Sequence, residues 1–457
     1  MKNSGTVKKS WTDLIPIFIV VTAFGPYIFP SYGLRIEHLV IYSLLLFAIP
    51  VFISQRRFVH WPKPLLGMLG IFLGITLWTL VVPNFVNYPT VSFQKYLSSI
   101  ENYVQPMAII ILVTVFIKYT LYEDFLNYLK YLCWCLIWLL CLNSILASCS
   151  IFFDMTNLMQ PFVKSCFGDT SVWQLAESMR RHSGIFNQPF ESGLTYSLGL
   201  FCWGYLNRSS LKVSFISGLV LGILTIGGIL SVSKVFIFCG LPLGLFYWNP
   251  IVSFKKYLNR RFFLGTITGL CFMLLIFSFW EGQDYFLRLF KIGKGTNLVE
   301  LYTGGRFGTK NYFVTSKGTT SKGTTPTLKA YSMITSKFVN VWQKSPWCGF
   351  GFGTVSCFDN AFLEFFHQGG LIALLGYLAL LVIYLWYSLR GFLKGYEEGR
   401  LLLVFFILIL ICSLGASVLT INRFSTIFWV LATFLFLMLQ ARQRAEDKIA
   451  FDQNSRD

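Results

Sequence analysis

The sequence is poor in charged residues and lacks the short motifs of several common enzyme classes. Only 13% of the 457 residues are charged, while 55% are hydrophobic and the mean hydropathy is +0.61. This composition excludes an ordinary soluble domain and indicates a polytopic membrane protein. There is no Walker-type glycine-rich loop, no His-Glu-x-x-His and no Gly-x-Ser-x-Gly. Nucleotide hydrolysis, zinc proteolysis and serine hydrolysis therefore have no support.

Cysteine is present, but its spacing does not suit a metal site. Most of the 11 cysteines lie inside apolar runs, where a thiol behaves as a small hydrophobe. Cys133 and Cys135 have no second pair at zinc-binding spacing. The sequence thus predicts no metal and no cofactor. Cys348 and Cys357 are candidates for a disulfide if their segment faces an oxidising compartment.

The apolar runs predict an all-α polytopic membrane protein with about twelve transmembrane helices, at about twenty residues for each helix. The first run lacks a small-residue cleavage site, so we expect it to be retained as a span. The predicted helices start near Leu14, Leu39, Leu65, Val104, Tyr131, Ser192, Val213, Val235, Phe262, Leu371, Leu401 and Thr426.

The basic residues alternate between the predicted loops. Inner loops carry groups such as residues 255–261, whereas the short outer loops hold single basic residues, which are Arg35, Lys95, Lys234 and Arg423. By the positive-inside rule this pattern predicts an even number of spans with both termini in the cytoplasm. The net charge of +18 is explained in the same way, so nucleic acid is not an expected partner.

The chain divides into membrane blocks and two longer outer segments. Residues 1–153 hold predicted transmembrane helices 1–5, residues 192–280 hold helices 6–9, residues 371–440 hold helices 10–12, and residues 441–457 form a cytoplasmic tail. The outer segments are residues 154–191 and the large outer loop 281–370. A loop this long between spans is predicted to be functional. Its basic residues outnumber its acidic ones, which favours an anionic substrate.

Four places at the predicted outer edge carry candidate functional side chains. An arginine offers a fork of donors that suits phosphate oxygens, and a carboxylate or imidazole can act as a general base. The four places are Arg180-Arg181-His182 with Asn187; Ser231-Val232-Ser233-Lys234; Arg306 between glycines; and Asp359-Asn360 with Glu364 and His367. Simpler interpretations stay open: interfacial anchors for the arginine pair, snorkelling of Lys234, a solvated Arg306, and a helix N-cap at Asp359.

Three of these blocks resemble the bacterial O-antigen polymerase and O-antigen ligase superfamily. Arg181-x-x-Gly184, followed by Phe186-Asn187 and Pro189, is similar to an Arg-x-x-Gly element of that family. Leu230-Ser-Val-Ser-Lys234 resembles its Ser-Arg or Ser-Lys turn. The run from Ser345-Pro346 through Gly349-x-Gly351, Asp359-Asn360 and Gly369-Gly370-Leu371 is similar to the block that closes its large periplasmic loop.

The resemblance implies a GT-C-like helical fold in the bacterial inner membrane and a metal-independent glycosyltransferase that uses undecaprenyl-pyrophosphate-linked oligosaccharides. Arg181 and Arg306, with Lys234 and Arg180, would hold the pyrophosphate and stabilise its departure. Asp359, Glu364 and His182 are the alternatives for the base, and Asn187 and Asn360 would contact the glycan. Membrane lipid and a chain-length-determining protein are the further partners that it implies.

One departure from the family favours a polymerase over a ligase. Ligases of this family tend to carry a histidine just before the asparagine of the last block, where this chain has Asp359. We therefore expect transfer of the glycan to the non-reducing end of another lipid-linked repeat unit of O-antigen or a related surface polysaccharide. The alternatives are an O-antigen ligase acting on lipid A core, a lipid-linked oligosaccharide flippase or other transporter, and a structural scaffold.

Overall fold

The computed structural model describes most of the chain and leaves out most of the predicted large loop. The described residues are 14–30, 33–55, 61–86, 91–117, 122–163, 172–178, 181–208, 214–248, 264–269, 271, 338–354, 360–420 and 422–454. The predicted site residues Arg180, Arg306 and Asp359 and the predicted disulfide partner Cys357 lie outside them.

The first part of the described chain consists of membrane-type helices joined by short connections. They are α1 (Ile15–Ala23), α2 (Ile36–Gln55), α3 (Lys63–Val81), α4 (Phe93–Phe116) and α5 (Tyr122–Phe152). A 3-10 turn (Val82–Asn84) extends α3, and Ser92 caps α4 by accepting a hydrogen bond from the Lys95 amide. Between α1 and α2, β1 (Tyr27–Phe29) and β2 (Leu34–Arg35) form an antiparallel ribbon that the sequence analysis did not predict.

The later elements include short helices in the predicted outer segment 154–191. They are α6 (Thr156–Met159), the 3-10 helix η3 (Gln160–Phe162) and α7 (Val172–Ser178). After them come α8 (Pro189–Arg208), α9 (Phe215–Leu230), the π-helical turn η4 (Phe236–Gly240), α10 (Leu241–Trp248), α16 (Ala361–Leu393), α17 (Glu397–Ser413), η5 (Val418–Thr420) and α18 (Asn422–Asn454). Residues 264–269 and 338–344 are also helical. The second of these confirms the short helix predicted from Phe338 to Gln343.

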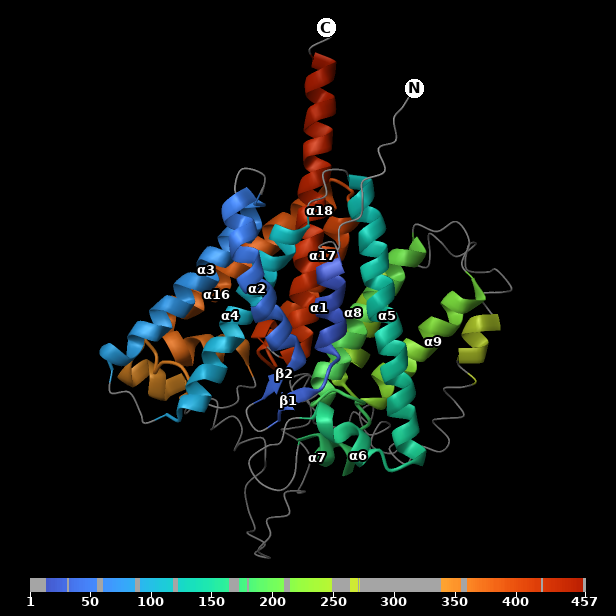
Figure 1. Ribbon diagram of the computed structural model, residues 1–457, viewed down its shortest axis with the longest axis horizontal. Helices are drawn as coiled ribbons and strands as arrows, with labels where there is room; N and C mark the ends of the chain where they lie inside the picture. Colours follow the sequence, from blue (N-terminus) through green and yellow to red (C-terminus); the bar gives the residue numbers. More distant parts are fainter. Residues whose placement is uncertain are drawn as a thin grey trace, which may run out of the picture.

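The helices pack around α18, which runs through the middle of the bundle (Figure 1). In the most apolar 18-residue stretch of α18, 89% of the residues are buried. The helix contacts α1, α4, α5, α8 and α17. Such burial requires apolar residues all round the helix, and the run from Phe424 to Leu439 supplies them. The other long apolar helices are buried on one side and carry exposed leucine, isoleucine and phenylalanine side chains on the other, as a lipid-facing helix does.

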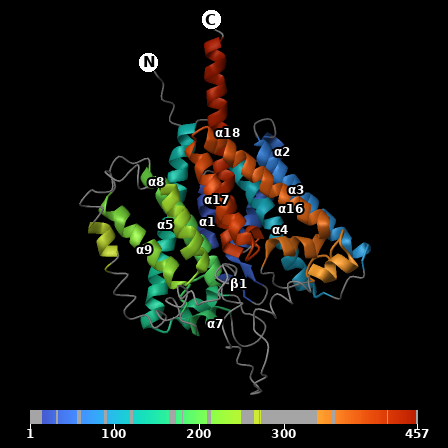
Figure 2. The ribbon, with the colours of Figure 1, turned by 180° about the vertical axis from the view of Figure 1, so that it is seen from behind.

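The two ends of the bundle differ. The start of α1 and the end of α18 lie at one end, and β1, β2, α6 and α7 lie at the other, which we call the ribbon end (Figures 1 and 2). The segments 154–163 and 172–191, which the sequence placed on a single side of the membrane, therefore gather at one end of the molecule.

The structure supports a membrane protein but not the full predicted count of spans. Within the described residues, five helices are long and apolar enough to cross a membrane by length and composition. Two helices begin before the predicted starts, α4 at Phe93 and α5 at Tyr122. The apolar runs mark only the middle of these helices, because polar residues continue the backbone hydrogen bonding beyond the runs. The count of about twelve stays a prediction.

Two glycines interrupt α16 near its beginning. Gly369 has φ −127° and ψ 15°, and Gly370 has φ 66° and ψ −158°, a conformation that is open almost only to glycine. A Cβ atom on Gly370 would also overlap the backbone of Trp347. The break separates the short helix 361–368, which carries Glu364 and His367, from the apolar remainder of α16.

We predict that Gly370→Ala lowers the free energy of unfolding by about 2 kcal/mol or more, because it adds backbone strain to a steric overlap. The matched variant is Gly74→Ala, in an exposed position of α3 with nothing within 4 Å of the added Cβ. We expect it to be neutral or stabilising by up to about 1 kcal/mol. Thermal unfolding of both purified proteins in detergent measures the difference; equal melting temperatures would contradict it.

Candidate anion-binding site

The segment 181–188 forms a turn between α7 and α8 that is held by a side chain of α5. The Asn143 side-chain amide donates to the Ser183 carbonyl (3.3 Å), and its Oδ1 accepts from the Ile185 amide (2.9 Å). Gly184 has φ +62°, and a Cβ at this position would overlap the Asn143 amide. The glycine of the Arg-x-x-Gly element is thus required by its backbone conformation and by this close approach.

Arg181 contacts the second predicted motif directly. Its Nε donates to the carbonyl of Ser231 (3.4 Å), and its Nη2 donates to the carbonyl of Val232 (3.2 Å). The backbone amide of His182 donates to the Leu230 carbonyl (2.9 Å). These bonds join the end of α9 to the segment before α8. The structure therefore brings together two motifs that lie about fifty residues apart in the sequence.

Lys234 follows this turn and lies close to Arg181. Its ammonium group is about half-buried, and burial together with the positive charge of Arg181 lowers the pKa of Lys234 below its usual value. It has no hydrogen bond or ion pair with any residue that the structure describes. Two like charges near the same partly buried turn favour a bound anion, because an anion would relieve their repulsion.

His182 is buried and its Nδ1 lies 2.7 Å from the Ser150 Oγ of α5. A Glu177 carboxylate oxygen lies 3.9 Å from the same ring nitrogen. In a serine-histidine-acid relay the hydroxyl and the carboxylate use opposite nitrogens of the ring. The arrangement here is therefore not such a relay, and His182 remains a candidate base at the edge of the Arg181 site.

Asn187, a predicted glycan contact, points into the protein. It is buried and donates a hydrogen bond to the Tyr27 hydroxyl of β1. The contact fixes the segment 181–188 against the ribbon. Its direct contact with a glycan stays a prediction.

Glu364 lies in a second buried cluster. Its carboxylate accepts hydrogen bonds from the Ser417 hydroxyl and from the Gln368 side chain (3.5 Å), and Tyr103 of α4 donates to the same Gln368 (2.7 Å). Asn360 is the N-cap of α16: its side chain accepts from the Leu363 amide (3.1 Å) and donates to the Leu414 carbonyl (3.3 Å). The open interpretation of an N-cap at Asp359 was thus off by one residue.

The glycine-rich block 345–354 folds onto the break in α16. The Phe350 amide donates to the His367 carbonyl (2.8 Å), and the Leu371 amide donates to the Pro346 carbonyl (2.8 Å). Gly349 adopts φ +69°, and a Cβ there would collide with the backbone at Gly370. The His367 Nδ1 lies 3.3 Å from the Thr354 hydroxyl. This packing requires glycine at positions 349 and 370.

The sequence analysis missed a buried ionic network at the ribbon end. Arg35 and Arg423 were read as single basic residues of outer loops, but their exposed fractions are 1% and 0%. Arg35 pairs with Glu37, which also accepts from Gln105 (3.2 Å). Both arginines lie over the Tyr27 ring, at 5.9 and 5.6 Å from its centroid. The available signal was their position directly beside apolar runs, where a charge needs a partner.

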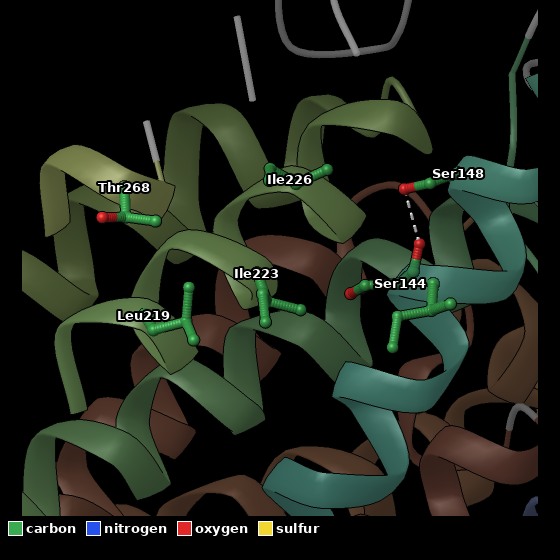
Figure 3. A pocket seen from close by; sticks show the side chains of 7 residues that line it. Ser144, Ser148, Leu219, Ile223, Ile226 and Thr268 are labelled. Carbon is green, nitrogen blue, oxygen red and sulfur yellow. Dashed lines mark hydrogen bonds between the residues drawn. The ribbon is translucent and has the colours of Figure 1, made fainter. Parts of the chain in front are cut away.

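An apolar cavity lies one helical turn from the Arg181 site. It measures about 280 Å³ and is lined by Ser144, Ile145, Ser148, Leu219, Ile223, Ile226 and Thr268. Figure 3 shows these side chains converging from α5, α9 and the helix 264–269. The neighbouring Asn143 holds the segment 181–188, and Ser150 contacts His182. The cavity and the cations thus share α5 as one wall.

Comparison with known proteins gives no further assignment, since neither any family model nor any curated protein matches the chain.

We predict that the charge on Lys234 makes stability depend on pH. Because the folded state lowers the pKa of Lys234, it binds this proton less tightly than the unfolded chain does. Stability therefore rises as pH increases through the lowered pKa toward the ordinary lysine value. The measurement is the melting temperature between pH 7 and 10.5 for wild type and Lys234→Met. We expect Lys234→Met to melt at a higher temperature than wild type at pH 7, and this difference in melting temperature to shrink as pH rises. A difference that stays constant with pH would contradict the prediction.

Proposed function

We propose that this chain is a membrane glycosyltransferase that polymerises O-antigen or a related surface polysaccharide. In this proposal, about twelve helices of a GT-C-like fold lie in the bacterial inner membrane with both termini in the cytoplasm. The donor is an undecaprenyl-pyrophosphate-linked oligosaccharide, and the acceptor is the non-reducing end of another lipid-linked repeat unit. A chain-length-determining protein is a proposed partner.

The single observation that carries this proposal is the pairing of Arg181 with Lys234. The two residues come from separate motifs, meet at the end of α9, and have both been set partly out of water. A pyrophosphate group would supply the negative charge that this place favours, and the charge on the leaving pyrophosphate would grow during transfer. Stabilising that growth accelerates departure, which is electrostatic catalysis.

The cavity beside the cations supports a lipid-linked substrate. Its lining is almost entirely apolar and lies between helices that carry exposed apolar side chains. An amphipathic molecule with its charged group at Arg181 would have a nearby apolar space for the first part of its chain.

The chemical step proposed here needs one base and no cofactor. The acceptor hydroxyl attacks the anomeric carbon while the bond from that carbon to the phosphate oxygen breaks. The hydroxyl proton passes to a base, and the lipid pyrophosphate leaves with the bonding electrons. Glu364, His182 and Asp359 remain the alternatives for that base. Arg306 and Arg180 are proposed to add positive charge around the pyrophosphate.

Two other functions are tested by the same experiment. An O-antigen ligase would use the same donor site and transfer the glycan to lipid A core. A transporter is favoured by a different observation, the buried network of Arg35, Glu37, Glu191 and Arg423, because ionisable groups inside membrane proteins often serve transport. In this chain these groups lie at helix ends and pair with one another, which suits a structural role better.

The decisive experiment resolves the surface polysaccharide of a strain lacking the gene on a gel. Lipid A core carrying one repeat unit in place of a ladder would support the polymerase. Bare core, with polymer retained on undecaprenyl pyrophosphate, would assign a ligase. Repeat units that stay on the cytoplasmic face would assign a flippase. An unchanged ladder would overturn the proposal.

We predict that Arg181→Lys fails to restore the ladder even though it keeps the charge. A lysine cannot hold the carbonyls of Ser231 and Val232 and offer donors to a pyrophosphate together, because it lacks the planar fork. Loss of a charge-stabilising donor typically lowers the rate by about 100- to 1,000-fold. The matched control is Arg390→Lys near the end of α16, which we expect to restore the ladder fully. Expression of both variants is compared by immunoblot, and normal polymer from Arg181→Lys would count against the pyrophosphate role.

A further inference from the structure

Arg423, near the start of α18, binds three separate parts of the chain. Its guanidinium donates to the carbonyls of Ile185, Gly25 (3.0 Å) and Phe162 (2.9 Å). These acceptors belong to the segment 181–188, to the end of α1 and to η3. The backbone amide of Arg423 donates to a Glu191 carboxylate oxygen in the first turn of α8 (3.0 Å). One residue therefore connects four segments at the ribbon end.

This set of acceptors suits arginine rather than lysine. The three carbonyls approach from different segments, and a planar guanidinium offers its donors in fixed directions toward them. The Tyr27 ring lies beneath the guanidinium, and the buried Glu191 carboxylate balances its charge. An ammonium group on a flexible stem would reach fewer of these carbonyls and would leave the others without a donor in a buried place.

The bond to Ile185 matters because this residue lies in the turn that carries Arg181 and His182. Asn143 holds the same residue by its amide, on the side of α5, while Arg423 holds its carbonyl from α18. Trp173 of α7 donates to the neighbouring Gly184 carbonyl (3.0 Å). The segment that carries Arg181 is thus held on both sides of Ile185, in addition to the bonds of Arg181 itself to the turn before Lys234.

We propose that Arg423 is a positioning residue for the anion site: by fixing the Ile185 carbonyl against α1 and η3, it sets the distance between Arg181 and Lys234. Arg423 itself contacts no substrate in this proposal. The proposal depends on the geometry of the two cations and not on glycan chemistry, so it is tested without an enzymatic assay.

The test uses the amine of Lys234 as a sensor of the nearby Arg181 charge. The purified full-length protein in lipid nanodiscs is treated with acetic anhydride at a series of pH values, and acetylation of the Lys234 peptide is followed by mass spectrometry. Exposed Lys344, in the helix 338–344, serves as the internal reference for reagent activity. Arg181→Gln defines the shift of the labelling midpoint that follows complete loss of the neighbouring charge.

We expect Arg423→Lys to move the Lys234 midpoint upward, in the direction of Arg181→Gln. Its labelling rate at a fixed pH below the midpoint should fall by about threefold, which corresponds to a shift of about half a pH unit. The double variant should shift no further than Arg181→Gln alone, because both changes act through the same pair of charges. A wild-type midpoint in Arg423→Lys, or additive shifts in the double variant, would overturn the proposal.

Two controls separate positioning from general loosening of the fold. The first control is Arg442→Lys, also in α18. Like Arg423, Arg442 lies over an aromatic ring, that of Tyr396 (4.3 Å), and it pairs with Glu398 (3.3 Å), so the substitution also removes a guanidinium from its partners. It should leave Lys234 labelling unchanged. If Arg423→Lys does not accumulate, Tyr27→Leu is compared with Tyr27→Phe, which keeps the ring beneath the guanidinium. The leucine variant should raise the midpoint above that of the phenylalanine variant, and equal midpoints would overturn the proposal.

Discussion

The buried contacts of Arg423 are the constraint on which the arrangement of the ribbon end depends. A guanidinium without exposure to solvent is stable there only because carbonyls and the Tyr27 ring surround it, while the Glu191 carboxylate, which accepts from the Arg423 backbone amide, offsets its charge. Those groups come from α1, η3, the turn before α8 and the first turn of α8. The cost of burying the charge is therefore met only when all four segments are in place, which makes their assembly cooperative.

This constraint connects the core of the bundle to its candidate site. α18 occupies the middle of the molecule, and its first residues reach the segment that carries Arg181. Arg181 then joins that segment to the turn after α9, where Lys234 lies. The same loop before α18 also contributes Ser417 to the Glu364 cluster. The two groups of candidate residues are thus attached to neighbouring parts of the chain, Ser417 in the connection between α17 and α18 and Arg423 in the first turn of α18.

Sequence reasoning predicted the helices better than their surroundings. Apolar runs identify helices such as α3 and α9 because lipid or core contacts select for continuous apolarity. The Arg181 element and the Lys234 turn were found from side-chain chemistry, and the structure places them in contact. Arg35 and Arg423 were misread, since the positive-inside rule counts basic residues and contains no information on which carboxylates or carbonyls lie nearby. The ribbon was missed because two strands this short carry no alternating pattern.

The contacts of the glycines were also not predictable from the sequence. The sequence does not distinguish a helical glycine that faces open space from one that touches another backbone. Gly74 has nothing within 4 Å of an added Cβ atom, whereas a Cβ atom on Gly222 would lie 2.7 Å from the Cα atom of Gly269. The second contact brings α9 close to the helix 264–269, and these helices form one side of the apolar cavity. Small residues thus help to determine the shape of this cavity. The charged residues of the sequence predict the chemistry of the candidate site, whereas the shape of the cavity depends on glycines, whose contacts the sequence does not show.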